Sequence, residues 1–192
     1  MGREFELKYG ADAGTLECIR RAYAGFRVLC METTYYDDGE NNISRRRWTL
    51  RRRLENGVSV CTVKTTLPDG SRGEWETEAA EVEAALPRLI AMGAPGELAE
   101  FAKNGLVPTC GARFTRRAAM LPAGDGLVEL ALDSGVLLGG GKELPFWEVE
   151  VEQKQGTDAD TLQFAQALAQ RFSLTPQPKS KLSRALALAN ED

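Results

Sequence analysis

Charged and apolar residues alternate along several short segments of this chain, and this alternation constrains the fold more than any other feature. At the N-terminus, Glu4, Glu6 and Lys8 are separated by Phe5 and Leu7. Because successive side chains of a β-strand point to opposite faces, such a segment predicts a strand with one charged face and one apolar face. The same spacing groups further charged residues: Arg51 with Arg53; Arg72, Glu74, Glu76 and Glu78; Glu129 with Asp133; and Glu148, Glu150 and Glu152.

Turn residues and helical periodicity predict the remaining elements. We expect strands at about 2–9, 26–37, 46–54, 58–66, 72–79, 108–119, 126–133 and 145–154, and a short one near 136–139. We expect helices at about 12–25, 80–92, 95–104, 157–172 and 180–189. A chain dominated by strands of this kind, with amphipathic helices between them, indicates one α+β domain rich in antiparallel strands.

The charged strand faces have two interpretations. The common one is an amphipathic sheet whose charged face lies in water. Here, however, carboxylates and guanidinium groups are sorted into different strands, whereas a solvated surface mixes them. The amphipathic helices also need an apolar sheet face to cover, so we expect the charged faces to curl together and line a barrel. Unpaired charges in a dry interior cost on the order of tens of kcal/mol, so this interior must be wet, internally paired or built for a charged ligand.

Composition excludes several classes of function. The chain has no histidine, which removes the commonest general base, so carboxylates, Lys, Arg, Tyr or a metal-bound water must serve instead. Its 4 cysteines form no C-x-x-C pair, which argues against zinc and indicates reduced thiols in the cytoplasm. The net charge of −4 argues against nucleic acid as a partner. We see no signal peptide and no membrane span, so we expect a cytoplasmic protein without membrane contact.

The basic residues of the lining predict an anionic ligand. Because a planar guanidinium group binds phosphate through two parallel hydrogen bonds, several arginines in one cavity indicate several phosphates. Of the neighbouring Arg113, Arg116 and Arg117, strand parity favours Arg116. The candidate substrate-binding residues are Lys8, Arg51, Arg53, Lys64, Arg72, Arg116, Lys181 and Arg184.

The acidic residues of the lining would repel the same anion unless a cation lies between them. Mg²⁺ or Mn²⁺ takes oxygen ligands and can join carboxylates to phosphate oxygens. The two sets of residues together therefore predict a site for a metal ion and a polyphosphate. The candidate metal ligands are Glu4, Glu6, Glu129, Asp133, Glu148, Glu150 and Glu152.

These residues also form motifs. Glu4-x-Glu6-x-Lys8 resembles the E-x-E-x-K signature of the CYTH, or triphosphate tunnel metalloenzyme, family. The other motifs follow in the order that the family has, over nearly the whole chain. They are Thr34-Tyr35-Tyr36-Asp37, Leu50-Arg51-Arg52-Arg53, Thr62-Val63-Lys64, Arg72-Gly73-Glu74-Trp75-Glu76, Phe114-Thr115-Arg116, Glu129 through Asp133-Ser134-Gly135, Glu148-Val149-Glu150-Val151-Glu152, and Ser180-Lys181 with Arg184.

The resemblance implies a fold and an activity. The fold is a closed eight-stranded antiparallel β-barrel that forms a tunnel, with helices packed outside, in one CYTH-like domain over residues 1–192. The activity is metal-dependent hydrolysis of a triphosphate, and the motifs look most like those of bacterial inorganic triphosphatases. An adenylate cyclase acting on ATP and a non-catalytic module that binds polyphosphate or nucleotide are the alternatives. We expect a monomer or a homodimer.

Phosphoryl transfer depends mainly on positioning and charge neutralisation. We therefore expect Arg51, Arg53, Lys64 and Arg116 to hold the phosphate chain, with Lys8 near a phosphate at one end. A metal-bound water is the expected nucleophile. The proton acceptor stays open among Glu74, Glu76 and a lysine, so the candidate catalytic residues are Lys8, Lys64, Glu74 and Glu76.

Overall fold

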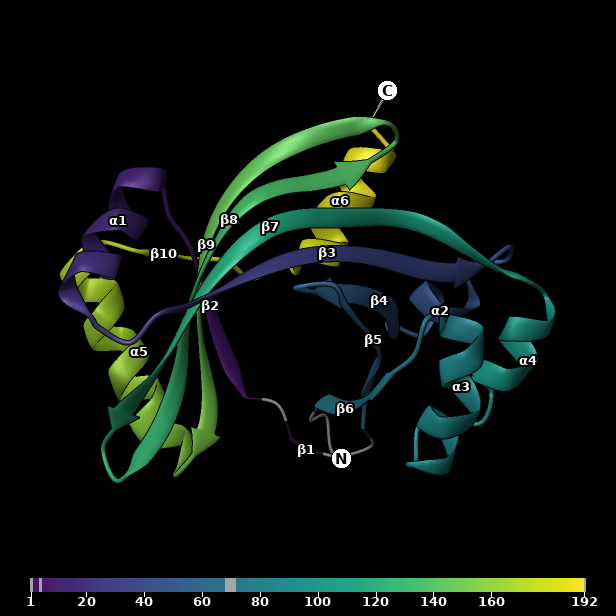
Figure 1. Cartoon of the computed structure of the whole chain (residues 1–192), viewed down its shortest axis with the longest axis horizontal. Coiled ribbons are helices and arrows are strands. Elements are labelled where there is room, and N and C mark those ends of the chain that lie inside the picture. The colour runs from purple at the N-terminus through teal and green to yellow at the C-terminus, as the bar shows by residue number, and fades with distance from the viewer. Residues whose placement is uncertain (1, 4, 68–71, 192) are drawn as a thin grey trace.

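The computed structural model describes residues 2–3, 5–67 and 72–191, so the predicted metal ligand Glu4 lies outside the described residues. The strands are β1 (Gly2–Arg3), β2 (Glu6–Gly10), β3 (Arg27–Asp38), β4 (Thr49–Glu55), β5 (Val58–Thr66), β6 (Arg72–Glu78), β7 (Leu106–Ala123), β8 (Gly126–Gly139), β9 (Lys142–Gln155) and β10 (Thr175–Pro176). The helices are α1 (Ala13–Ala22), α2 (Asn42–Arg45), α3 (Val82–Ala91), α4 (Leu98–Lys103), α5 (Asp158–Phe172) and α6 (Lys181–Ala189) (Figure 1).

The described strands form one antiparallel sheet of ten strands, in the order β1-β6-β5-β4-β3-β7-β8-β9-β2-β10. The α+β prediction is confirmed. The closed eight-stranded barrel is not confirmed, because the order runs from β1 to β10 and these two end strands do not pair in the part of the chain described. Nevertheless, β1 pairs with β6 while β2 pairs with β9, and only residues 4 and 5 separate β1 from β2. The N-terminal segment therefore pairs with strands near both ends of the sheet order, β6 and β9.

Local chemistry explains where elements differ from the prediction. The segment predicted as a strand from residue 46 enters β4 only at Thr49, because the Asp37 carboxylate accepts hydrogen bonds from the backbone N–H groups of Ile43 and Ser44 and so caps the unpredicted helix α2. The two predicted strands at 126–133 and 136–139 are one strand, β8. Gly135 lies within it, where a Cβ atom would come within 2.2 Å of a backbone oxygen of β7, so glycine here permits close pairing and marks no turn.

Apolar residues from the alternating segments form cores on the outer face of the sheet. Val149 and Val151 of β9 pack against α1 and α5, and Val63 and Trp75 of β5 and β6 pack against α3 and α4. Figure 1 shows these two groups of helices at opposite ends of the curved sheet. Within the described residues, no helix is long and apolar enough to cross a membrane.

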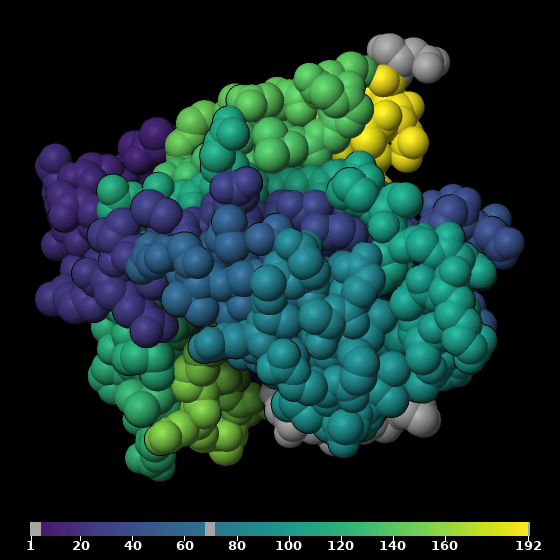
Figure 2. All heavy atoms as spheres, turned by 45° about the vertical axis from the view of Figure 1, so that its right-hand side comes forward, coloured from purple at the N-terminus to yellow at the C-terminus, as the bar shows by residue number. Residues whose placement is uncertain are grey.

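Helix α6 departs from the prediction that all helices pack outside. Its Leu182 and Ala185 pack against Met31 and Phe114, which belong to the inner face of the sheet. Gly139 at the end of β8 permits close contact, because a Cβ atom there would lie 2.3 Å from the Ala185 carbonyl oxygen. In the space-filling view of Figure 2, α6 (yellow) emerges beside the long strands (green), while β3 to β6 and α3 (blue to teal) cover the front.

Candidate functional site

A cavity of about 330 Å³ lies between the charged strand faces, as the alternation predicted. Ionisable side chains dominate its lining. The predicted site residues on this surface are Glu6, Lys8, Arg51, Arg53, Lys64, Arg72, Glu74, Glu76, Arg116, Glu129, Glu150, Glu152 and Lys181. Asp133 and Glu148 lie behind it and contact Arg116 and Lys181 of the lining, and Arg184 in turn contacts Glu148.

The carboxylates gather on one side of the cavity, which we call the acidic wall: Glu6 of β2, Glu129 and Asp133 of β8, and Glu148, Glu150 and Glu152 of β9. Strand register explains the grouping. Glu152 lies opposite both Glu6 and Glu129, and Glu148 lies opposite Asp133. Like charges in adjacent strands repel, so the wall requires cations.

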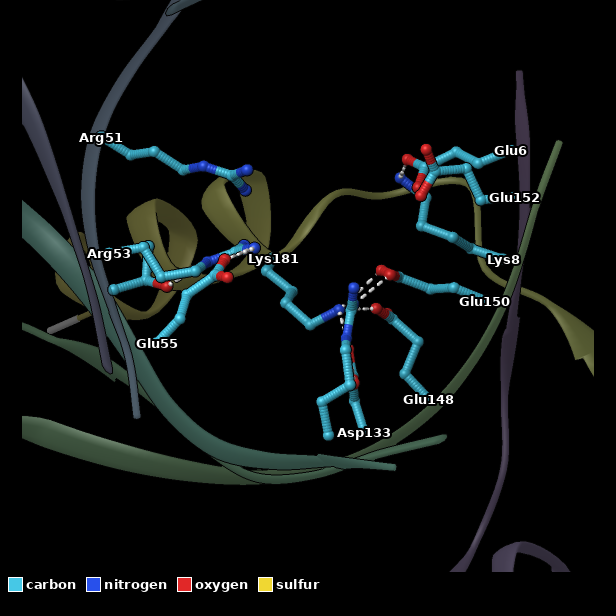
Figure 3. Close-up of polar contacts among 12 residues, drawn as sticks. Glu6, Lys8, Arg51, Arg53, Glu55, Asp133, Glu148, Glu150, Glu152 and Lys181 are labelled. Atoms are coloured by element: carbon cyan, nitrogen blue, oxygen red, sulfur yellow. Dashed lines mark hydrogen bonds and ion pairs between the residues drawn. The ribbon is translucent and has the colours of Figure 1, made fainter. Parts of the chain in front are cut away.

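The deepest carboxylates meet three cations in what we call the inner cluster, made of Asp133, Glu148, Glu150, Arg116, Lys181 and Arg184. Arg116 donates two parallel hydrogen bonds to Asp133, at 2.8 and 2.7 Å, and another to Glu150. Lys181 Nζ lies 2.8 Å from Asp133 Oδ2 and 2.7 Å from Glu150 Oε1, and it also contacts Glu148. Arg184 bonds to Glu148 from the next turn of α6. Figure 3 shows Lys181 reaching these carboxylates from the centre of the site.

The pKa values of the two neighbouring glutamates of the inner cluster shift in opposite directions. Burial and the nearby Glu150 carboxylate raise the pKa of Glu148 to about 7, even though Lys181 opposes them. Burial also acts to raise the pKa of Glu150, but Lys181 and Arg116 outweigh it and hold that pKa well below its ordinary value. Glu150 is therefore the carboxylate that the cations hold ionised most firmly.

The outer carboxylates of the acidic wall each have a cationic partner, which is more exposed than the carboxylate at Glu129 and Glu152 but less exposed at Glu6. Lys8 lies 3.3 Å from Glu6, Arg27 lies 2.9 Å from Glu129, and Lys154 lies 2.7 Å from Glu152. Arg27 and Lys154 were not among the predicted site residues. Lys154 continues the alternation two residues after Glu152 and could have been found from it, whereas Arg27 shows its role only through the register of β3 with β7.

Burial raises the pKa of Glu152, and the charges of Glu129 and Glu6 add to this effect, while Lys154 opposes it. The three carboxylates are therefore close enough for their negative charges to repel one another. That is the electrostatic condition under which a divalent cation is favourable, and oxygen ligands of this kind suit Mg²⁺ or Mn²⁺.

The cations gather on the opposite side, which we call the basic wall: Arg51 and Arg53 of β4, Lys64 of β5 and Arg72 of β6. Its ion pairs are longer than those of the inner cluster. Lys64 and Arg51 lie 3.2 and 3.6 Å from Glu74, and Arg53 lies 3.6 Å from Glu55, which the prediction missed. Figure 3 shows Arg51 and Arg53 extending from their strand toward the acidic wall.

Two cations of the basic wall, Arg51 and Arg53, are incompletely satisfied by the described residues. Burial lowers the pKa of Arg53 to about 10, and the charges of Arg51 and Arg116 add to this effect. The buried Arg51 Nε has no hydrogen-bond partner among the residues described. Burial acts to raise the pKa of Glu74, but Lys64 and Arg51 outweigh it, so this pKa is lowered and Glu74 stays ionised between the two cations.

The three arginines of β7 do not all line the cavity, as strand parity predicts. Arg116 lies on the cavity surface. Arg113 is 60% exposed and pairs with Glu143 at 2.9 Å on the exterior. Arg117 follows Arg116 directly in the strand and is absent from the residues that line the described cavity.

Among the described residues, one group of carboxylates has its oxygens close enough together for a metal ion. The oxygens of Asp133, Glu148 and Glu150 lie within 4.8 Å of one another, but this group already bonds to three cations. Glu6, Glu129 and Glu152 lie in register on adjacent strands without their oxygens gathering in this way, and each has one ion-pair partner among the described residues. A hard divalent cation would break fewer ion pairs in this second group, although its carboxylates would have to move closer together to bind it.

Two comparisons with known proteins identify the family and one curated relative of this chain. The CYTH domain family matches residues 2–186 of this chain. An inorganic triphosphatase of Haemophilus influenzae is 24% identical over 198 residues, which cover 100% of this chain and 56% of that protein. The chain therefore spans about half the length of this curated relative.

Solved structures resemble the fold over nearly the whole chain. The protein PH1819 of Pyrococcus horikoshii has a TM-score of 0.67 and 21% identity, covering 96% of this chain and 99% of that one. A Hippeastrum protein, HpAC1, named as an adenylyl cyclase and described as having a dominant triphosphatase activity, has a TM-score of 0.68 and 15% identity, covering 98% of this chain and 97% of that one. At these identities the likeness establishes the fold alone.

Proposed function

The chain belongs to the CYTH domain family, and from that premise we propose that it hydrolyses a triphosphate, with inorganic tripolyphosphate as the preferred substrate. The basic wall carries the proposal. Arg53 is buried and its pKa is depressed by burial and by its cationic neighbours, while the Arg51 Nε atom lacks a partner among the described residues. A polyanion in the cavity would supply the missing negative charge.

The kinship with the Haemophilus influenzae inorganic triphosphatase supports this choice of substrate. The proposal also covers domain organisation, location and partners. We propose one CYTH-like domain over residues 1–192, a cytoplasmic location, and a monomer or homodimer that binds no nucleic acid. The predicted substrate-binding residues remain part of it, except that Arg116, Lys181 and Arg184 have carboxylate partners in the inner cluster. We therefore assign the phosphate chain to Arg51, Arg53, Lys64, Arg72 and Lys8.

Mg²⁺ or Mn²⁺ is the proposed cofactor, held by Glu6, Glu129 and Glu152, with Glu4 as a further predicted ligand. When bound, such an ion supplies charge neutralisation at phosphate oxygens and lowers the pKa of a coordinated water. The cationic partners Lys8, Arg27 and Lys154 then become available to other anions. All three line the cavity, and Lys8 is the most buried of them, so we assign it to a terminal phosphate.

The residues of the cavity position the reactants. Arg51 and Arg53 orient the terminal phosphoryl group, and a water oxygen attacks its phosphorus. The bond from that phosphorus to the bridging oxygen breaks, pyrophosphate leaves with the bonding electrons, and the water gives up a proton. Lys64 and Arg72 neutralise charge on the leaving pyrophosphate, so the protein supplies positioning and electrostatics.

The proton acceptor was left open between Glu74, Glu76 and a lysine. Lys64 and Arg51 lower the pKa of Glu74, which makes this carboxylate a weak base and suits it to hold the two cations in place. Glu76 lines the same cavity and lies two residues after Glu74 in β6, on the same face of the strand. We therefore propose Glu76 as the acceptor of the water proton.

A cyclase acting on ATP is the second candidate, and one observation favours it. A second cavity adjoins the first and shares Glu6, Lys8 and Arg72 with it. Apart from Gln177, the rest of this cavity is lined by the largely apolar residues Phe5, Leu7, Tyr9, Pro176 and Pro178. Such a surface could accept the organic group of a nucleoside triphosphate. The adenylyl cyclase name of the Hippeastrum protein adds support.

One panel of assays tests the proposal. Tripolyphosphate, ATP and thiamine triphosphate are each incubated with Mg²⁺ or Mn²⁺, and phosphate, ADP and cyclic AMP are measured. We expect phosphate release to be fastest from tripolyphosphate. Cyclic AMP from ATP would identify the cyclase instead, and metal-dependent binding without any product would identify a non-catalytic module.

A substitution ties the activity to the acidic wall. Glu6→Gln removes a carboxylate charge with little change in size and should lower phosphate release by about 10²-fold or more. The matched control is Glu32→Gln, a strand carboxylate that is exposed outside the cavity and should leave turnover unchanged. Unchanged turnover in Glu6→Gln would refute the assignment of the metal to this wall.

A further inference from the structure

Helix α6 begins inside the cavity. Ser180, which caps its N-terminus, and the first two helical residues, Lys181 and Leu182, all line the cavity surface. The rest of the helix is fixed by apolar packing, because Leu182 and Ala185 contact the inner face of β3 and β7. The helix therefore delivers Lys181 into the site at a set depth.

The Lys181 ammonium group occupies the point where three carboxylates converge. It contacts Asp133, Glu148 and Glu150, which are the carboxylates whose oxygens lie within 4.8 Å of one another. Lys181 itself is only 7% exposed, and its ammonium also lies 5.3 Å from the centre of the Phe114 ring. A lysine so deeply buried needs these negative charges around it.

The charges of this cluster are balanced. Its three carboxylates face three cations, since Arg116 bonds to Asp133 and Glu150 while Arg184 bonds to Glu148. A divalent cation added to this arrangement would bring excess positive charge into a buried site. It would also need carboxylate oxygens that the ammonium and guanidinium groups already use.

We propose that Lys181 is an internal cation that takes the place of a metal ion between Asp133, Glu148 and Glu150. In this arrangement the ammonium docks α6 on the cavity wall and excludes divalent metal from these three carboxylates. Docked α6 and a metal ion at this position are mutually exclusive. Removing the ammonium leaves three carboxylates with two guanidinium groups, a net negative site that a divalent cation should enter.

The test counts metal ions and needs no catalysis. Mn²⁺ bound per chain is measured by equilibrium dialysis, without any triphosphate, for the unmodified chain and for Lys181→Met. Lys181→Met should bind about one Mn²⁺ more, because it opens the oxygen-rich position. The matched control is Lys179→Met, which removes an exposed lysine two residues earlier and should bind the same number as the unmodified chain.

Further variants locate the added ion. The double variant Asp133→Asn with Lys181→Met should lose the additional Mn²⁺, and Asp133→Asn alone should bind as many Mn²⁺ ions as the unmodified chain. Hydrogen exchange provides a second readout, since the backbone amides of α6 should exchange faster in Lys181→Met than in Lys179→Met. Lys181→Gln, which keeps a hydrogen-bond donor without the charge, replaces Lys181→Met if the latter fails to fold.

Two results would overturn the inference. One is a Mn²⁺ count that stays the same in Lys181→Met and Lys181→Gln. The other is a lower count in Asp133→Asn alone, which would mean that metal already occupies these carboxylates in the unmodified chain. Failure of the proposed triphosphatase activity would leave the Mn²⁺ counts unaffected, so the two proposals are tested separately.

Discussion

The two walls of the cavity differ in how far their charges are neutralised by the protein itself. On the acidic wall, every described carboxylate that the sequence analysis singled out has a cationic partner, and inner-cluster distances are 2.8 Å or less. On the basic wall the ion pairs lengthen to 3.2–3.6 Å, and Arg53 carries a depressed pKa because it is buried and because Arg51 and Arg116 lie near it. The acidic wall is largely neutralised from within, whereas Arg51 and Arg53 of the basic wall are incompletely satisfied by the described residues.

This difference separates fold from function. A buried ion pair that is satisfied contributes mainly to holding a unique structure, and breaking it is costly. A buried cation without full compensation destabilises the free protein, and an anionic ligand can remove that cost. We therefore expect substitutions deep in the acidic wall to affect folding most, and substitutions in the basic wall to affect substrate handling most.

The largest effect should follow Asp133→Asn. Asp133 is fully buried, and its substitution leaves Arg116 and Lys181 without one of their carboxylate partners. Breaking a buried ion pair from one side costs about 3–5 kcal/mol. For a chain of this size the melting temperature should fall by roughly 6–20 °C, measured by thermal unfolding.

The control for this prediction is Asp125→Asn, in the exposed turn between β7 and β8. An exposed aspartate away from ion pairs should change stability by no more than about 0.5 kcal/mol. If Asp133→Asn melts like this control, the inner cluster contributes little to folding and the contrast between the walls disappears.

Sequence patterns predicted much of this arrangement and missed what depends on distant pairing. The alternation of Glu148, Glu150 and Glu152 predicted a charged strand face, because side-chain direction in a strand has a period of two. The pairing of Glu148 with Lys181 and Arg184 was not predicted, since it depends on α6 entering the cavity. Period and charge show which residues share a face, but they do not reveal which residues from another element reach that face.

The pairing of the N-terminal segment was also not predictable from the sequence pattern. The N-terminal segment was predicted as one strand over residues 2–9, yet it divides into β1 and β2, which pair with β6 and β9. A run of alternating residues predicts the strand but not which partner each half selects. Selection depends on the curvature of the whole sheet, which ten strands determine together.

The second largest effect should follow Arg51→Met, on activity. This substitution removes a partly buried guanidinium group from the basic wall while Lys64 continues to hold Glu74. Loss of one preorganised group that stabilises developing charge lowers kcat by about 10²–10³-fold. Phosphate release from tripolyphosphate measures this loss, and the melting temperature should change far less than in Asp133→Asn.

Arg52→Met is the matched control, because Arg52 is the next residue of the same strand and donates to Ser59 on the other face. It should keep nearly all the activity. Equal losses in the two variants would show that β4 as a whole, and not the side of the strand that faces the cavity, determines turnover.

The smallest effect concerns pH and Arg53. Burial together with Arg51 and Arg116 lowers the pKa of Arg53 to about 10, so in the free protein this side chain loses its charge as the pH rises above that value. Phosphate binds the charged guanidinium, so tripolyphosphate affinity should fall as pH rises through 10. From pH 8 to pH 10.5 the fall due to this residue should be about fourfold.

Isothermal titration with tripolyphosphate, in the absence of metal, measures this dependence. Arg53→Met should bind more weakly at both pH values, and its affinity should decline about fourfold less between them, because other groups that lose protons in the same range are present in both proteins. The sign is diagnostic: a cation satisfied by carboxylates, as in the inner cluster, has a raised pKa and keeps its charge at pH 10.5. Parallel declines in the two proteins would therefore mean that Arg53 is already neutralised by the protein, and that the basic wall resembles the acidic one.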